Sequence, residues 1–289
     1  MRDISAEISA EIETAWQSRK SHTGQDIKAI SDQDMTAICQ NQRRPLREMC
    51  VACLKMGITP LRYLRNSPSI NISEQIILAE SEVAVAGAGG LGGHVILHLA
   101  RLGIGRLVVF DPDTFDETNL NRQALCFSNN IGVFKAEEAA RQCALINPFV
   151  EVATHTLPIT GPGQKSRLAT TDVIVDSLDS GKDRLSLSEL CRELGIPMIH
   201  GAVAGFEGRV MTVFPGDNGM EFLYPAETAD GEKPFSAENI LGTPALAPAL
   251  IAAFQAMAVL NILLKRGTSQ KNSLLHLDLA TASLNTFTL

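Results

Sequence analysis

The sequence has no excess of positive charge. Its 289 residues include 25 Lys and Arg against 32 Asp and Glu, for a formal net charge of -7. A protein that binds a long nucleic acid needs a basic face to neutralise the phosphates, so we expect no nucleic-acid partner. A local cluster of Lys and Arg could still hold one triphosphate. The chain also has no internal repeat and no low-complexity segment.

The sequence lacks two further signals, a secretory leader and a second pair of closely spaced cysteines. Residues 1–7 contain acidic side chains and no apolar core, so we expect a cytoplasmic protein. The six cysteines are then expected to be free thiols. Cys50 and Cys53 have the spacing of zinc ligands, but no second pair follows them. They lie in an apolar helical run, which favours a packing role.

One long stretch, Thr243–Leu264, carries no charged residue. By length alone it could cross a bilayer. It contains two prolines, Gln255 and Asn261, and no similar stretch accompanies it. We therefore expect a buried helix or a subunit interface, and no membrane partner.

Residues 1–60 are predicted to form a helical extension. Ile8 and Ile12 recur at helical spacing, Ser31 is placed to cap a second helix, and Pro45 to open a third. No group of residues with a recognisable chemical role occurs there. The purpose of this extension is open at this point.

From residue 61 onward, strand and helix patterns alternate. The predicted strands are 83–86, 107–110, 150–156, 173–176 and 197–199, and the helices between them include 133–146 and 184–194. This alternation predicts a Rossmann-like, doubly wound α/β fold with a mainly parallel sheet and ligands at the carboxyl ends of its strands. An antiparallel strand at 208–214, a long loop at 215–242 and two terminal strands at 274–279 and 282–288 follow.

Between the first strand and its helix stand Gly87, Gly89 and Gly92, in the spacing G-x-G-x-x-G. The first glycine permits a tight turn, the second lets the backbone approach a phosphate, and the third lets helix and strand pack closely. The N-terminus of the helix attracts an anion. A nucleotide is therefore the first hypothesis.

Asp111 ends the second strand, about twenty residues after the glycines, where an acidic side chain usually binds ribose hydroxyls. A dehydrogenase that uses NAD would show the same glycines and the same acid. These residues alone therefore leave a nicotinamide-dependent oxidoreductase open. A non-catalytic nucleotide-binding scaffold, docked through the helical extension, is a third possibility.

Three further clusters favour a triphosphate. Asn119 and Arg122 follow Asp111, Lys135 lies at the start of the next helix, and Asp179 follows the strand 173–176. A triphosphate with a pyrophosphate leaving group needs Lys, Arg and a carboxylate that holds Mg²⁺. A dinucleotide needs less cationic help.

At this point the chain resembles the ubiquitin-activating-enzyme-like adenylyltransferases, the ThiF, MoeB and HesA family. The resemblance covers about Arg62 to the C-terminus. It rests on Arg-Tyr-x-Arg at 62–65, the G-x-G-G-L-G loop, the box Asn-Leu-Asn-Arg-Gln at 119–123, Ile-Gly-x-x-Lys-Ala at 131–136, and the strand end that carries Asp179. We therefore divide the chain into a helical extension, 1–60, and a ThiF-like ATP-binding adenylation domain, 61–289.

The resemblance implies a role for each of these residues. Arg122 and Lys135 would neutralise the triphosphate, Asp179 would hold Mg²⁺, and Arg65 would reach the ATP of the second subunit of a homodimer. The implied nucleotide-binding set is Gly87, Gly89, Gly90, Leu91, Gly92, Asp111, Asp113, Asn119, Arg122, Lys135 and Asp179.

The family's reaction also follows from the resemblance. The C-terminal carboxylate of a small ubiquitin-like sulfur carrier ending in Gly-Gly attacks ATP, giving an acyl-AMP and pyrophosphate, for thiamine or molybdopterin synthesis. A carboxylate is ionised at pH 7, so no general base is needed. The lack of a Ser-His-Asp or Cys-His group therefore agrees with this reaction.

The chain departs from the family pattern in its cysteines. Many relatives hold zinc with two Cys-x-x-Cys pairs in the C-terminal half, but no cysteine follows Cys191 here. We therefore expect no structural zinc. Cys126 is the cysteine nearest to the nucleotide motifs, and its neighbours Leu125 and Phe127 favour a small apolar filler. We predict adenylation without a covalent enzyme thioester.

Overall fold

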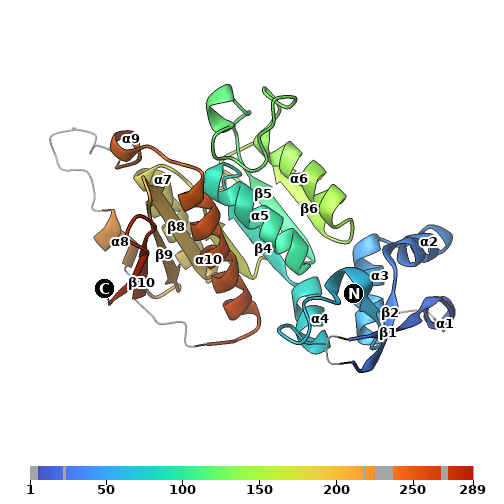
Figure 1. The fold of residues 1–289 in the computed structure, drawn as a ribbon. Helices are drawn as coiled ribbons and strands as arrows, with labels where there is room; N and C mark the ends of the chain where they lie inside the picture. Colours follow the sequence, from blue (N-terminus) through green and yellow to red (C-terminus); the bar gives the residue numbers. More distant parts are fainter. Residues whose placement is uncertain (1–5, 22–23, 218, 225–236, 268–272, 289) are drawn as a thin grey trace.

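The computed structural model describes residues 6–21, 24–217, 219–224, 237–267 and 273–288. Within them, one sheet of eight strands has the order β11-β10-β9-β8-β7-β4-β5-β6 (Figure 1). The strands from β6 to β8 run parallel to one another, and β9, β10 and β11 are added antiparallel. The predicted fold class, a mainly parallel Rossmann-like sheet with antiparallel C-terminal strands, is confirmed.

The bounds of the eight strands lie close to the predicted ones. They are β4 Glu82–Ala86, β5 Arg106–Phe110, β6 Glu151–His155, β7 Val173–Asp176, β8 Met198–Ala204, β9 Glu207–Val213, β10 Ser273–Asp278 and β11 Ser283–Thr288. Every residue of β4 and of β7 is buried. These two strands are therefore apolar on both faces, as strands inside a covered parallel sheet are.

Helices cover both faces of the sheet. Alternate residues of β4 show this directly, because Val83 and Val85 belong to one apolar cluster and Ala84 and Ala86 to another. The first cluster contains side chains from α5 Gly90–Leu102, α6 Lys135–Ile146 and α10 Leu246–Leu263. The second contains side chains from α7 Gly181–Leu194. The sheet is thus the middle of three layers (Figure 1).

Helix α7 begins earlier than predicted. The pattern placed its start at Arg184, whereas the structure starts it at Gly181. Ser180 is the cause, because its side chain accepts a hydrogen bond from the backbone N–H of Asp183 and so caps the helix. Its first turn is thereby brought next to Asp179.

The N-terminal segment contains the three predicted helices, α1 Ala6–Ala15, α2 Asp32–Gln42 and α3 Leu46–Lys55. The prediction of a helical extension did not include three short strands, β1 Gln17–Lys20, β2 Asp26–Ile30 and β3 Thr59–Pro60, which form a small sheet there. Strand β1 is polar and fully exposed, so it has no apolar alternation to reveal it. The signal available was Gly24, whose φ of +80° suits the hairpin turn.

These elements enclose a core of their own, which we call the N-terminal core. Its buried residues are Ile8, Ile12, Ile30, Met35, Ile38, Cys39, Met49–Leu54, Ile58, Tyr63, Ala79 and Phe149. Ala79 belongs to α4 Ile72–Glu80, and Phe149 comes from the connection between α6 and β6. Asn147 Nδ2 donates to the hydroxyl of Tyr63 and to the carbonyl of Ala100, each at 2.8 Å. The N-terminal segment therefore packs beside α4 at one end of the sheet (Figure 1).

Two elements lie in the region predicted as a long loop, 215–242. They are α8 Gly219–Leu223 and α9 Ala237–Leu241, and residues 218 and 225–236 of this region lie outside the described residues. The charge-free stretch forms α10, which in the described part of the chain is the one helix long and apolar enough to cross a membrane. Its buried residues pack on α5 and on the sheet, which accounts for its composition.

Candidate nucleotide site

A cavity of about 440 Å³ opens where β4, β5 and β7 end. It lies at the carboxyl edge of the parallel strands, where the fold class predicts a ligand. Most of the predicted binding residues line it, namely Gly87, Gly89, Gly90, Leu91, Asp111, Asp113, Arg122, Lys135 and Asp179. The structure thus brings the separate sequence motifs to one place.

The glycines of the loop are required by close contacts. Gly87 has a φ of +90°, and a Cβ on it would lie 2.8 Å from the carbonyl oxygen of Ser177. A Cβ on Gly92 would lie 1.8 Å from the carbonyl oxygen of Gly87. Gly92 is not one of the described residues that line the cavity. It lets α5 approach the loop closely, which is the role predicted for the third glycine.

Asp111 holds the glycine loop through a hydrogen bond to its backbone. Its side chain is almost fully buried, and its oxygens accept hydrogen bonds from the backbone N–H of Ala88 at 2.7 Å and of Asp113 at 2.9 Å. Burial raises the pKa of Asp111, and the two backbone donors and the nearby Lys135 offset this only in part. Each carboxylate oxygen can accept a second hydrogen bond, so the carboxylate can also bind ribose hydroxyls.

The cation Lys135 starts α6 and points at the same region. Its side chain is mostly buried, and its Nζ lies 3.0 Å from Asp113 Oδ2. Asp113 itself is exposed, with 66% of its side chain accessible. An incoming phosphate can therefore take the place of the Asp113 carboxylate beside Lys135.

Asn119 has a different position from the one predicted. It is buried outside the set that lines the cavity, and its Oδ1 accepts from the backbone N–H of Asp116 in the short 3₁₀ turn Glu117–Asn119. Its carbonyl accepts from the N–H groups of Arg122 and Gln123. Asn119 therefore holds the turn that presents Arg122, and its direct contact with a nucleotide stays a prediction.

Several lining residues were not predicted from the sequence. They include Phe110, Gln123, Pro158–Thr160, Ser177, Leu178, Asp183, Arg184, Val203, Thr243 and Pro248. Within the described residues, Gln123 Oε1 and Ser177 Oγ are buried without a hydrogen-bond partner. Buried polar atoms rarely stay unpaired, so these two suggest contacts made by a ligand. Pro158–Thr160 follow the carboxyl end of β6, a position that the strand-end rule could have indicated.

The last predicted residue, Arg65, lies elsewhere. It is exposed just after the short turn Leu61–Tyr63 and does not line the cavity of its own chain. Asp179, in contrast, lines the cavity together with Asp183. Asp179, the predicted Mg²⁺ ligand, thus lines the same cavity as Arg122 and Lys135, whereas Arg65 does not.

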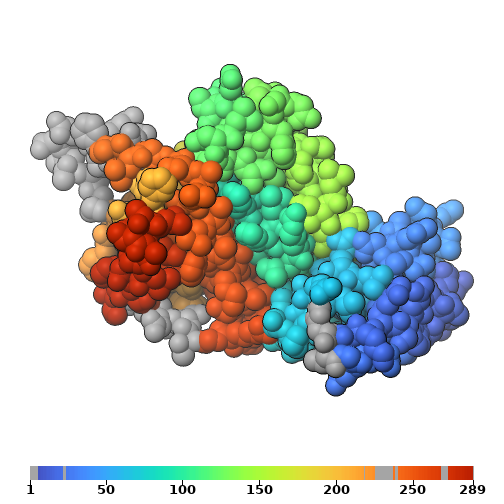
Figure 2. Space-filling view, in the orientation of Figure 1, coloured from blue at the N-terminus to red at the C-terminus, as the bar shows by residue number. Residues whose placement is uncertain are grey.

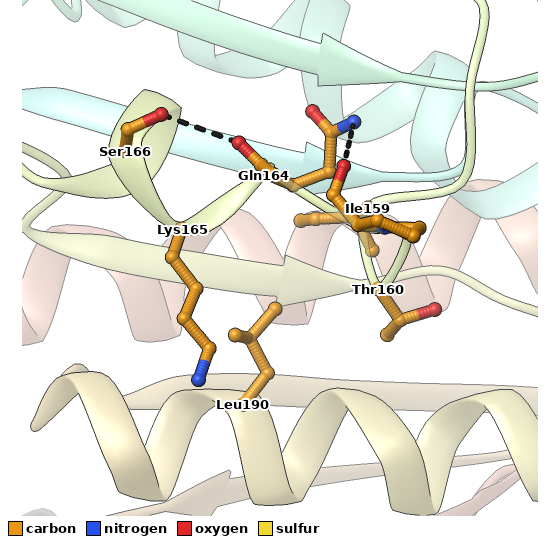
Figure 3. A pocket seen from close by; sticks show the side chains of 9 residues that line it. Ile159, Thr160, Gln164, Lys165, Ser166 and Leu190 are labelled. Carbon is orange, nitrogen blue, oxygen red and sulfur yellow. Dashed lines mark hydrogen bonds between the residues drawn. The ribbon is translucent and has the colours of Figure 1, made fainter.

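Another cavity, of about 430 Å³, is lined by the segment 159–166 and by Leu190 of α7 (Figure 3). It shares Ile159 and Thr160 with the first cavity. Lys165 is the cation that lines it, and its Nζ pairs with Glu193 at 2.5 Å. The polar side chains that a triphosphate needs therefore line the first cavity and not this one.

All six cysteines lie among the described residues, and each is a buried free thiol. Cys126 belongs to the core under α5 and α6, and burial raises the pKa of its thiol. Cys50 and Cys53 lie in the N-terminal core. Packing accounts for all three positions.

Comparison with known proteins agrees with the geometry of this site. The ThiF family matches residues 63–289. The chain is 35% identical to the SAMP-activating enzyme E1 of Haloferax volcanii over 201 residues, which are 70% of this chain and 74% of that enzyme. It is 30% identical to the sulfur carrier protein adenylyltransferase of Thermus thermophilus over 235 residues, 78% of this chain and 86% of the relative.

Some relatives are longer. The adenylyltransferase and sulfurtransferase MOCS3 of Arabidopsis thaliana is 31% identical over 72% of this chain, but the match spans only 46% of that protein. Among solved structures, E. coli MccB with ATP superposes with a TM-score of 0.65 at 23% identity, covering 88% of this chain and 82% of MccB. That likeness shows the fold. With the family match over residues 63–289, the chain belongs to the ThiF family.

Proposed function

We propose that the protein is an ATP-dependent adenylyltransferase. It activates the C-terminal carboxylate of a small ubiquitin-like sulfur carrier as an acyl-AMP and releases pyrophosphate. The observation that carries this proposal is one cavity in which a glycine loop, Asp111, two cations and Asp179 converge. Relatives named as adenylyltransferases support the same reaction.

The residues of the cavity fit ATP with Mg²⁺. Asp111 would accept hydrogen bonds from the ribose, and the glycine loop at the start of α5 would approach the phosphates. The unpaired Gln123 Oε1 and Ser177 Oγ leave polar atoms for a ligand to satisfy. Asp179 would hold Mg²⁺, with Asp183 close by. When bound, Mg²⁺ neutralises charge on the phosphate oxygens. The cysteines are all buried as packing residues, so we propose no structural zinc.

The chemistry then requires positioning and charge neutralisation. The carrier carboxylate is already ionised and attacks the α-phosphate in line, forming a C–O–P bond as the bond to pyrophosphate breaks. Lys135 and Arg122 stabilise negative charge on the phosphates. Lys135 changes its partner from Asp113 to phosphate, so no new charge has to be buried without a partner.

The carrier tail would enter beside the β4–α5 loop. Thr243 and Pro248 line the cavity at the start of α10, and small residues such as Gly90 lie against Pro248. A Gly-Gly tail would fit beside these residues, because glycine has no side chain to accommodate. The relatives that are named for a SAMP or for a sulfur carrier protein support a protein substrate of this type.

Exposed apolar side chains support a homodimer. Leu120, Phe127, Ile131, Val133 and Phe134 are exposed in the segment that follows Asp111, drawn in green at the top of Figure 2. Leu246 and Met257 are exposed on α10. Asn121 donates to the carbonyl of Thr243, so the segment and the start of α10 are neighbours. Exposed apolar side chains on two neighbouring segments are typical of an interface.

The position of Arg65 supports a role in the second subunit. The start of α10 adjoins the cavity, and its far end adjoins Ser69, whose carbonyl accepts from Arg266 at 2.7 Å. The 18 residues of α10 span about 27 Å. Arg65 is therefore far from its own cavity, whereas a partner lying antiparallel along α10 would present its arginine there.

The decisive experiment is pyrophosphate–ATP exchange. We expect exchange with a recombinant ubiquitin-like carrier ending in Gly-Gly, and none with the same carrier lacking its last glycine. Tight NAD binding without exchange would favour a nicotinamide-dependent oxidoreductase instead. ATP binding without AMP product under any condition would favour a non-catalytic nucleotide-binding scaffold.

Subunit mixing tests the arginine separately. Arg65→Ala and Lys135→Ala dimers should each be inactive. After random exchange of subunits about one quarter of the sites should regain activity, because each mixed dimer contains one intact site. If Arg65 served its own subunit, mixing would restore nothing.

A further inference from the structure

Four side chains and the backbone of Leu178 form a closed ring of hydrogen bonds beside the cavity. Asp176 ends β7, His200 lies in β8, Tyr224 follows α8, and Arg184 lies in α7. Asp176 and His200 have no exposed surface. The roles predicted above for nucleotide binding and catalysis use none of the four, although Arg184 lines the cavity.

The donors and acceptors of the ring have one consistent order. His200 Nδ1 lies 2.7 Å from Asp176 Oδ2, and a carboxylate can only accept, so Nδ1 carries the proton. His200 Nε2 is then an acceptor for the Tyr224 hydroxyl at 3.3 Å. The oxygen of that hydroxyl accepts from Arg184 Nη1. Burial lowers the pKa of His200, which agrees with the neutral imidazole that this order requires.

The backbone of Leu178 closes the ring. Its N–H donates to Asp176 Oδ1 and its carbonyl accepts from Arg184 Nε, each at 3.0 Å. The ring therefore holds the middle residue of the turn 177–179 by its backbone. Leu178 and Asp179, at the end of this turn, both line the nucleotide cavity.

Packing adds to these hydrogen bonds. The Arg184 guanidinium lies over the ring of Tyr224 at 5.2 Å, and the His200 and Tyr224 rings meet edge to face with centroids 5.6 Å apart. A Cβ on Gly181 would lie 3.1 Å from Tyr224 Cδ1, so the tyrosine covers the first turn of α7. Glu221 of α8 pairs with Arg192 of α7 at 2.6 Å. Helix α8 is thus tied to the far end of α7, and Tyr224 after it to the first turn of α7.

We propose that His200 and Tyr224 are positioning residues that hold the turn 177–179 and Arg184 against the nucleotide cavity. They act through Asp176 and Arg184 and touch no substrate themselves. This positioning role rests on the proposed function, in which Asp179 binds Mg²⁺ with ATP. Because Tyr224 follows α8 directly, a displacement of α8 would loosen this turn.

Tyr224→Phe and His200→Asn test the ring, with His276→Asn as the matched control. His276 pairs with Glu207 on the outer strands, away from the cavity lining. We expect Tyr224→Phe to lower kcat about tenfold, the loss of one charge-assisted hydrogen bond, while KM for ATP changes less than about threefold. The control should leave both constants unchanged.

Two readouts do not depend on turnover. The first is the gain in ATP affinity on adding Mg²⁺, measured by titration with and without EDTA. We expect both ring variants to lose most of that gain and to keep the affinity for metal-free ATP. The second is ¹⁵N NMR of labelled histidine, in which His200 should show the Nδ1–H tautomer and Tyr224→Phe should shift its Nε2 signal.

The outcomes are distinguishable. If the ring variants keep kcat and the Mg²⁺-dependent gain within about twofold of wild type, the positioning role is wrong. An Nε2–H tautomer for His200 would also overturn it. If the wild-type protein forms no acyl-AMP with any carrier, the proposed function fails instead, and the ring is judged by Mg²⁺-dependent ATP binding and by NMR. If His200→Asn does not fold, Tyr224→Phe decides.

Discussion

The nucleotide cavity and the N-terminal core both contain buried ionisable groups, but they differ in what surrounds those groups. Asp111 follows the end of β5, Lys135 starts α6, and both line the cavity. In the N-terminal core, Cys39, Cys50 and Tyr63 pack against apolar side chains. Burial raises the pKa of Cys39 to about 11 and of Cys50 to about 12, so both thiols stay protonated at pH 7.

The difference shows when a buried polar group indicates function. A thiol that stays neutral in a closed core is a packing residue. A carboxylate held by two backbone donors at the edge of a parallel sheet keeps its charge available for a ligand. Burial is common to both regions, and access to a cavity distinguishes them.

The largest effect that would sharpen this comparison is expected at Lys135. Lys135→Ala should lower kcat/KM for adenylation by about 10² to 10³, because it removes a preorganised charge at the phosphates. Thermal stability should change little, since the lost ion pair is with the exposed Asp113. Pyrophosphate–ATP exchange and a melting curve measure the two effects. An active variant would remove Lys135 from the site.

A smaller effect is expected from the pH dependence of Asp111. Its pKa is raised above the ordinary value, so on acidification the carboxylate takes up a proton earlier than an exposed aspartate does. The protonated group is a poorer acceptor for ribose hydroxyls, and affinity should fall as the pH falls through that pKa, by about threefold to tenfold. Adenosine is the suitable probe, because it has the ribose and no phosphate to titrate.

Asp111→Asn is the control for this titration. The amide does not ionise, so the variant should bind adenosine more weakly and with no acid limb. If the variant kept the same pH dependence as the wild type, the titrating group would be another residue.

The smallest effect is expected in the N-terminal core. Tyr63→Phe removes the acceptor for Asn147 Nδ2, a buried hydrogen bond of 2.8 Å. We expect a loss of about 1–2 kcal/mol in the free energy of unfolding and no change in kcat. Denaturant unfolding and exchange assays measure these. A change in kcat with unchanged stability would contradict the division between the two regions.

The sequence predicted the features that depend on local patterns. The strand β4, the glycine loop and Asp111 occur together in one βαβ unit, so spacing alone places them at one edge of the sheet. The order of Arg122, Lys135 and Asp179 then favoured a triphosphate over a dinucleotide, and this assignment stays a prediction. Lys135 starts α6 and Asp179 follows the end of β7, whereas Arg122 lies in the connection between β5 and α6.

The features that could not be predicted depend on distant contacts or on weak patterns. Pro158–Thr160 line the cavity from a loop with no motif of its own, so only their place after the end of β6 could have indicated them. The contact between His200 and Tyr224 depends on how α8 folds back over α7, which no periodicity encodes. Strand β1 is polar and exposed, so only its partner β2 and the turn at Gly24 could have indicated it.

Phe149 has a consequence for how the protein is made. It fills the N-terminal core, yet the ribosome adds it long after the rest of that core has left the exit tunnel. Domains generally fold as units during synthesis, beginning with the N-terminal one. Here the first unit has to wait with an apolar gap until the α6–β6 connection emerges. A nascent chain that exposes α4 but not yet the α6–β6 connection would therefore be a good ligand for a chaperone, and one in which that connection has emerged a poorer one.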